Sequence, residues 1–383
     1  MLKFNLTMKF TQFLFFIFFM MCAVSCKKEP RIVIKSIEPE SIIKHAKGFD
    51  IVDDNGIKKL IIKTAFQNST EVSEYEISKK NSNSTSKNKI IKVPIQRIAL
   101  TSTTHIPMVE LLNKETTIVG FANTKYVSSE KTSALIAVGK IKEIGKESSL
   151  NTEVILDLKP EIVIGFSVSA ANKSLKTLQK SGIPVLYNGD WLEETPLGRA
   201  EWIKFFGVLF DKEKQADSIF KVIEANYLKA KNSALKATTK PTILSGAIMS
   251  KDIWNLPAGN SFVAQFLKES NTNYLWNNSK GKGSLSLSFE SVFEKGKDAD
   301  FWIAPGYFSS KEQLLQSNQI YTEFEAFKNN KIYTPSTKKG KTGGVLYYEL
   351  APVRPDLVLK DLIKITHPNL LPNYTLTFFE KMQ

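Results

Sequence analysis

A stretch without proline runs from Leu197 to about Leu235 and divides the chain into two parts. Proline interrupts helices because it lacks the amide hydrogen of the helical ladder, so this stretch can be helical, with a break near Asp211 that can cap a second segment. One face of that second segment is apolar and consists of Ala216, Ile219, Phe220, Ile223 and Tyr227. We therefore predict a helical segment over 197–238 that contains a long amphipathic helix.

Strands and helices alternate on both sides of this segment. Strand patterns cover 96–100, 117–121, 161–165 and 184–187 before it, and 242–246, 301–304 and 331–333 after it. Helical patterns lie between these strands, a spacing that is typical of βαβ units with a parallel sheet. The predicted fold class is α/β, with two similar lobes at 93–196 and 239–383. A long rigid helix joins the lobes, and a ligand cleft lies between them.

The chain before the first lobe, residues 27–92, has a β pattern. Asn55-Gly56 stands between two runs of alternating apolar and polar residues, which is a strong signal for a type I′ hairpin. Residues 79–89, KKNSNSTSKNK, contain no apolar anchor and are expected to form a loop. Nothing in this N-terminal extension suggests chemistry, and we interpret it as a small sheet that begins the first lobe.

The first 26 residues indicate export. Lys3 and Lys9 precede an apolar run, 13–21, which is too short to span a membrane comfortably and is typical of a secretory signal. Residues 23–26, AVSC, resemble a bacterial lipobox, in which the cysteine is lipidated and becomes the new first residue. Cys26 is therefore the expected lipid anchor. The alternatives are an ordinary signal cut nearby and a buried N-terminal helix.

Composition argues against several classes of protein. Both cysteines lie in the first 26 residues and the chain has three histidines, so we expect neither a disulfide framework nor a Cys- or His-rich metal centre in the body. Lys and Arg number 52 against 38 Asp and Glu, a net charge of +14, but export argues against nucleic acid as a partner and no nucleic-acid-binding motif is present. No G-x-S-x-G or H-E-x-x-H pattern occurs. An exported lipoprotein hydrolase with an unrecognised site and a binding protein for bare metal ions stay open as alternatives.

The two lobes repeat one pattern, in which a short helix with an acid at its start leads through a turn into a buried strand. The copies are 153–165 and 290–304. Together with the interlobe helix, Asn151 to Ile164, Phe289-Glu290 and 354–362, this pattern resembles the ABC-transporter solute-binding proteins of the helical-backbone class. Members of that family are periplasmic lipoproteins that capture ferric siderophores, corrinoids and haem. The resemblance covers about residues 95–371.

The resemblance implies a lipid-anchored periplasmic protein without catalysis. Its partners would be an ABC permease with its ATPase, it would be a monomer, and it would have no intrinsic cofactor or metal site. The ligand would be a chelate of iron or cobalt. In this family a glutamate on each lobe pairs with arginines of the permease, and the motif assigns that role to Glu153 and Glu290. Both acids could instead serve only to stabilise a helix N-terminus.

Ligand contacts are expected in the loops after the carboxyl ends of the strands. The residues that we predict there are Thr104, Trp191, Arg199, Trp254, Tyr307 and Tyr347. Aromatic rings suit a flat corrin, porphyrin or catecholate, and an arginine can meet the negative charge of a chelate. Arg199 could instead form a salt bridge at the start of its helix. Because a long helix is stiff, closure of the cleft is expected to be a small tilt around a large ligand.

Overall fold

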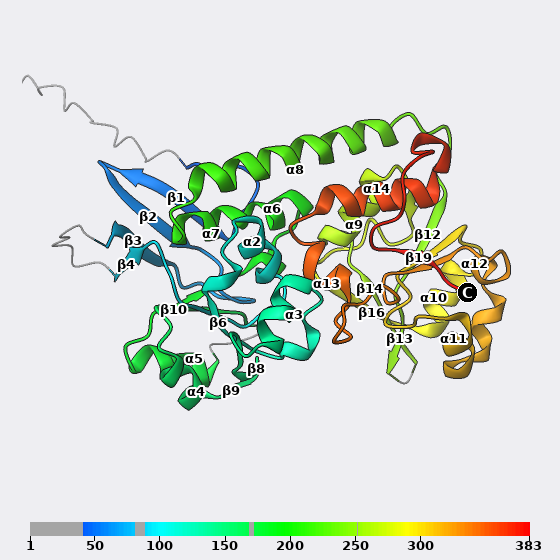
Figure 1. The fold of residues 1–383 in the computed structure, drawn as a ribbon. Helices are drawn as coiled ribbons and strands as arrows, with labels where there is room; N and C mark the ends of the chain where they lie inside the picture. The colour runs from blue at the N-terminus through cyan, green and yellow to red at the C-terminus, as the bar shows by residue number, and fades with distance from the viewer. Residues whose placement is uncertain (1–40, 81–88, 168–171, 251) are drawn as a thin grey trace, which may run out of the picture. The chain divides into compact units, whose positions relative to one another are not determined.

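The computed structural model describes residues 41–80, 89–167, 172–250 and 252–383 (Figure 1). Cys26, the signal-like segment and the middle of the polar loop predicted at 79–89 lie outside the described residues. Within the described ranges no helix combines the length and the apolar character that a membrane span requires.

The N-terminal sheet has four strands in the order β1-β2-β3-β4. The strands are β1 (Phe49–Asp54), β2 (Ile57–Ile62), β3 (Ser73–Lys79) and β4 (Lys89–Val93). β1 and β2 form an antiparallel hairpin, and at its turn Asn55 and Gly56 have φ values of 55° and 83°. Asn and Gly adopt these positive angles more readily than other residues, so the predicted hairpin is confirmed. The boundary that we placed at residue 92 falls inside β4, which pairs with β3 in parallel.

This sheet shares its hydrophobic core with the first lobe. Phe49 packs against Trp202 and Phe205, with ring centroids 4.4 Å and 6.2 Å apart. Ile62 and Tyr75 are buried in the same cluster of side chains. The extension is therefore built into the first lobe, in agreement with its interpretation from sequence.

Two buried carboxylates hold the segment that leads into β1. Glu201 accepts hydrogen bonds from the backbone amides of residues 44–46 at 2.6–3.0 Å and from Lys204 Nζ at 2.9 Å. Glu193 accepts from the amides of residues 47 and 48 and from the indole nitrogen of Trp202. A buried carboxylate is stable only when its oxygens are paired in this way, so the extension and these acids depend on each other.

The first lobe is a parallel sheet in the order β11-β10-β5-β6-β7. Its strands are β5 (Ile98–Leu100), β6 (Ile118–Phe121), β7 (Lys142–Glu143), β10 (Ile162–Gly165) and β11 (Val185–Tyr187), and a short hairpin is formed by β8 (Gly145–Lys146) and β9 (Ser149–Leu150). The helices are α2 (His105–Leu111), α3 (Glu130–Ala137), α4 (Thr152–Leu158) and α5 (Lys173–Lys180). β5 and β10 are buried along their whole length, as expected for parallel strands that are covered on both faces.

The second lobe has a main sheet in the order β15-β12-β17-β18-β19, in which only β19 is antiparallel to its neighbour. Its strands are β12 (Thr242–Ser245), β15 (Asn273–Tyr274), β17 (Phe301–Ile303), β18 (Ile332–Thr334) and β19 (Glu380–Lys381). A smaller antiparallel sheet contains β13 (Ala247–Ser250), β14 (Ile253–Pro257) and β16 (Ser284–Ser288). The helices are α9 (Phe262–Glu269), α10 (Phe289–Gly296), α11 (Lys311–Ser317), α12 (Glu325–Lys328), α13 (Leu346–Leu350) and α14 (Pro355–Thr366). The predicted α/β fold class with two lobes is therefore confirmed.

The helical segment between the lobes consists of α6 (Pro196–Glu201), α7 (Ile203–Leu209) and α8 (Glu213–Ala234). The chain breaks at Asp211, which has a φ of 56°, close to the predicted position. α8 has 22 residues, which at 1.5 Å per residue is about 33 Å. Phe220 and Ile223 on α8 belong to the core of the first lobe, and Tyr227 belongs to the core of the second. One helix thus packs against both lobes (Figure 1).

Candidate ligand-binding cleft

A cavity of about 460 Å³ lies between the two lobes. Its walls in the first lobe follow the carboxyl ends of β5, β6 and β10, with Thr101, Ser102, Thr103, Ala122, Asn123 and Phe166, and are completed by Tyr126 and Glu147. Its walls in the second lobe are Tyr307, Gly343, Val345 and Tyr348. The cavity therefore lies where parallel α/β sheets place their ligands.

Three exposed tyrosines line this cleft. Tyr307 and Tyr348 have ring centroids 6.0 Å apart and remain 69% and 42% exposed. Tyr126, on the opposite lobe, is 54% exposed. Large exposed rings that line one cavity from two lobes are available to stack on a flat ligand.

Glu147 is the single charged side chain among the described residues that line the cavity. It lies in the turn between β8 and β9, and its partial burial raises the pKa of its carboxyl above the ordinary value. We did not single out this residue from the sequence, because a glutamate in a polar turn looks like a solvated side chain. We also did not single out Tyr126 or the glycine-rich loop that carries Gly343 from the sequence.

Three of the predicted ligand residues lie at or next to the cavity. Tyr307 lines it directly. Thr104 follows the lining segment 101–103, and its hydroxyl donates to Asp190 at 3.3 Å. Trp191 is half-buried and packs against Phe166, with ring centroids 5.8 Å apart. The indole nitrogen of Trp191 is buried and has no hydrogen-bond partner within the described chain.

Arg199 forms a buried salt bridge and does not line the cavity. The side chain is about nine-tenths buried, it donates to Asp190 Oδ2 at 3.1 Å, and its guanidinium carbon lies 4.4 Å from the ring centroid of Phe262. This is the alternative that the sequence left open for Arg199. Because Asp190 neutralises it, Arg199 is a weak candidate for binding an anionic group of a ligand.

Trp254 lies in the core of the second lobe, and the half-buried Tyr347 packs against that core. Tyr347 packs against Phe378 and Phe379, and burial raises the pKa of its hydroxyl to about 12; its neighbour Tyr348 lines the cavity instead. Trp254 lies in β14, is fully buried and stacks on Trp302. Its indole nitrogen donates to the carbonyl of Ser245 at 2.9 Å, so the structure places Trp254 in the core and not in the cleft.

Glu349 of α13 connects the two lobes. Its carboxylate accepts hydrogen bonds from the backbone amides of Ser128 and Ser129 at 2.7 Å and 2.8 Å, at the start of α3. Burial raises the pKa of Glu349 to about 7, although the bonds from Ser128 and Ser129 act in the opposite direction. The loop before α13 reaches the same place, since a side chain at Gly340 would collide with the backbone of Ser128.

The two predicted docking acids occupy matching positions. Glu153 lies in the first turn of α4, which Asn151 caps, and Glu290 lies in the first turn of α10, which Ser288 caps. Both acids are exposed. The structure thus confirms their equivalent placement on the two lobes, and their role in docking stays a prediction.

In the described ranges no group of three or more His, Cys, Asp or Glu side chains is arranged to hold a metal ion. His105, the first residue of α2, is fully buried, and its two ring nitrogens have no hydrogen-bond partner within the described chain. Its burial lowers the pKa of its ring to about 4, and the nearby Asp190 raises it only in part.

Comparison with known proteins identifies the class of protein that this fold and cleft define. Residues 98–337 match the periplasmic binding protein family, and the chain belongs to that family. It is 28% identical to the uncharacterized lipoprotein MJ0878 of Methanocaldococcus jannaschii over 301 residues, 76% of this chain and 70% of the relative. It is 27% identical to a second uncharacterized lipoprotein of that organism, MJ0872, over 74% of this chain and 72% of the relative.

Solved structures share the fold. A possible iron-binding periplasmic solute-binding protein from Staphylococcus epidermidis is 22% identical, with a TM-score of 0.57 over 72% of this chain and 100% of that one. A periplasmic heme binding protein from Pseudomonas aeruginosa is 17% identical, with a TM-score of 0.56 over 76% of this chain and 98% of that one. The chain is thus a periplasmic binding protein with the two-lobed fold of these solved structures.

Proposed function

We propose that this protein is the substrate-binding component of an ABC importer that captures a metal chelate, namely haem, a ferric siderophore or a corrinoid. The observation that carries the proposal is the aromatic cavity between the lobes, with Tyr126 on one side and Tyr307 and Tyr348 on the other. Its volume of about 460 Å³ lies within the range of small-molecule sites, roughly 300–1,000 Å³. The iron-binding and heme-binding names of proteins with the same fold support an iron or cobalt chelate.

The chemistry of the walls bears on how the chelate is held. The rings can stack on its flat surface, while the hydroxyls of Thr101, Ser102 and Thr103 can hydrogen-bond to its polar groups. No cation lines the cavity within the described chain, and Arg199 is paired with Asp190. These walls favour a chelate that is held by stacking and hydrogen bonds over one that is held by salt bridges.

The proposal also includes delivery of the chelate to the membrane permease. Cys26 would anchor the protein to a cell membrane through lipid, as the lipoprotein names of its relatives suggest. Glu153 and Glu290 would meet basic residues of the permease, one on each lobe. Because α8 packs against the cores of both lobes, it resists bending, and the cleft would close by a small tilt.

The test is a tryptophan-fluorescence titration of the full chain against haem, corrinoid and siderophore probes. Four of the five tryptophans are buried in the cores, and Trp191 beside the cavity is the half-buried exception. A chelate in the cleft should therefore change the emission of the wild type but much less that of Trp191→Phe. Equilibrium dialysis should show that Trp191→Phe still binds.

Tyr307→Ala should weaken binding by about 1–3 kcal/mol, roughly 5- to 150-fold, because it removes one large stacking face. Leu228→Ala, at a residue that is 43% exposed on α8, is the matched control and should bind like the wild type. Binding of no probe, or equal affinity in Tyr307→Ala, would contradict the proposal.

A further inference from the structure

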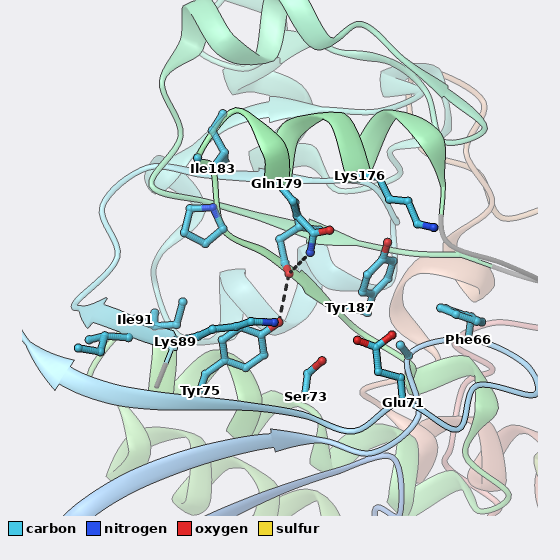
Figure 2. A pocket seen from close by; sticks show the side chains of 15 residues that line it. Phe66, Glu71, Ser73, Tyr75, Lys89, Ile91, Lys176, Gln179, Ile183 and Tyr187 are labelled. Carbon is cyan, nitrogen blue, oxygen red and sulfur yellow. Dashed lines mark hydrogen bonds between the residues drawn. The ribbon is translucent and has the colours of Figure 1, made fainter. Parts of the chain in front are cut away.

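A second cavity, of about 530 Å³, lies between the N-terminal sheet and the edge of the first lobe (Figure 2). The N-terminal sheet and the loop after β2 contribute Phe66, Glu71, Tyr75 and Lys89 among others, and the lobe contributes residues of α5 and β11. The family match begins at residue 98, so one wall of this cavity is built by chain outside the matched region. None of its lining residues belongs to the interlobe cleft.

Three aromatic residues, Phe66, Tyr75 and Tyr187, line this cavity. Phe66 and Tyr187 meet edge to face, with ring centroids 6.1 Å apart. Tyr75 is buried and approaches from β3, and Figure 2 shows all three rings around the same space. Ile91 and Ile183 add aliphatic surface. Such walls are suited to one flat apolar ring.

Hydrogen-bonding groups inside this cavity are poorly satisfied. The hydroxyl of Tyr187 is buried and has no hydrogen-bond partner within the described chain. In Figure 2 it points toward α5, the helix that carries Lys176. The carbonyl of Val185 accepts two long contacts, from the Tyr75 hydroxyl at 3.4 Å and from Gln179 Nε2 at 3.5 Å. Buried polar atoms usually have partners, so a ligand atom that bonds them would be stabilised.

The charges at the rim favour an anion. Lys89 and Lys176 line the cavity together with one acid, Glu71, which leaves a net charge of +1. The ammonium of Lys89 lies 5.8 Å from the ring centroid of Tyr75. Burial raises the pKa of Tyr75 and of Tyr187, so both hydroxyls keep their protons at neutral pH and can donate.

We propose that this cavity is a second ligand site, which takes a small hydroxylated aromatic acid of the hydroxybenzoate type. The ring of the ligand lies among Phe66, Tyr75 and Tyr187, its carboxylate meets the ammonium groups of the rim, and its hydroxyl bonds Tyr187. The site stands apart from the chelate cleft and does not depend on the function proposed for it.

The probe is 4-hydroxybenzoate, added to the full chain and followed by saturation-transfer NMR and isothermal titration. Tyr187→Phe removes only the unpartnered hydroxyl, so it should fold normally and bind about tenfold more weakly, as expected for one lost hydrogen bond. Lys176→Gln should weaken binding to a similar degree by removing a charge. Lys180→Gln is the matched control, because Lys180 is exposed on the same helix and does not line the cavity.

Two further ligands test the contribution of the carboxylate and that of the aromatic ring separately. We expect 4-hydroxybenzyl alcohol, which lacks the carboxylate, and cyclohexanecarboxylate, which lacks the aromatic ring, to bind at least tenfold more weakly than 4-hydroxybenzoate. Tyr307→Ala, in the interlobe cleft, should leave binding of 4-hydroxybenzoate unchanged. Three results would each overturn the proposal. They are no binding of 4-hydroxybenzoate at millimolar concentration, equal affinity for 4-hydroxybenzyl alcohol and 4-hydroxybenzoate, and wild-type affinity in both Tyr187→Phe and Lys176→Gln.

Discussion

At the scale of single residues, His105 is an ionisable group that the fold holds in its neutral form. It is fully buried, and its ring centroid lies 5.7 Å from that of Phe206. Neither of its ring nitrogens has a hydrogen-bond partner within the described chain. Its pKa falls to about 4 because burial disfavours the charged ring. Protonation of His105 therefore opposes folding.

The expected result is a loss of stability in acid that is specific to this residue. The pKa of His105 in the folded protein lies below its unfolded value near 6.5. The contribution of neutral His105 to the free energy of unfolding is therefore complete above pH 6.5, and up to about 3 kcal/mol of stability is lost as the pH falls toward 4. His105→Leu should remove this part of the pH dependence. Urea unfolding of both proteins at pH 7 and pH 4.5 measures the difference, and equal slopes of stability against pH would contradict the assignment.

At the scale of elements, Glu201 of α6 holds the entry to the N-terminal sheet. Its side chain is fully buried and bonds three consecutive backbone amides, those of residues 44–46, as well as Lys204. Burial by itself raises the pKa of Glu201, but the bonds from Lys204 and from the amides outweigh burial and lower it. The acid thus stays ionised and keeps its bonds through the neutral range.

Glu201→Ala should destabilise the protein by about 3 kcal/mol or more, because it leaves three backbone amides without their acceptor and removes the buried carboxylate partner of Lys204. Denaturant unfolding gives the magnitude, and hydrogen exchange at the amides of 44–46 shows whether the extension loosens first. Glu224→Ala is the control: Glu224 bonds His45 of the same segment through a partly exposed contact, and its loss should cost less than about 1 kcal/mol. Equal effects of the two variants would show that the buried amide bonds do not hold the extension.

At the scale of the whole molecule, the proposed docking acids act as a pair across two lobes. The double variant Glu153→Lys with Glu290→Lys should abolish uptake of the chelate in cells and leave the affinity of the purified protein within a few-fold. Charge reversal on both lobes replaces attraction to a basic permease surface by repulsion, while both residues lie outside the cavity lining.

A matched control is available for this double variant. Glu130 and Glu312 are also exposed acids in the first turns of helices, one in each lobe, so Glu130→Lys with Glu312→Lys changes the charge equally. The control should still support uptake. Loss of uptake in both double variants would mean that net charge, and not the positions of Glu153 and Glu290, is responsible.

Some features follow from the sequence because their causes are local. The apolar stripe of α8 repeats every three or four residues, and Asn55-Gly56 is suited to the positive φ angles of its turn. Asn151 and Ser288 begin α4 and α10 because their side chains accept from backbone amides three residues ahead. Each of these signals acts within a few residues, so it does not depend on the rest of the fold.

Other features were decided only by tertiary structure. Trp254 and Tyr347 look like aromatic ligands in the sequence, but the direction in which each side chain points depends on packing against Trp302 in one case and Phe378 in the other. Arg199 has its partner, Asp190, nine residues earlier, and only the fold brings the two together in a buried place. Burial and charge pairing arise between distant segments, and so a pattern of neighbouring residues determines the elements and the apolar stripe of α8 but not which distant side chains each element meets.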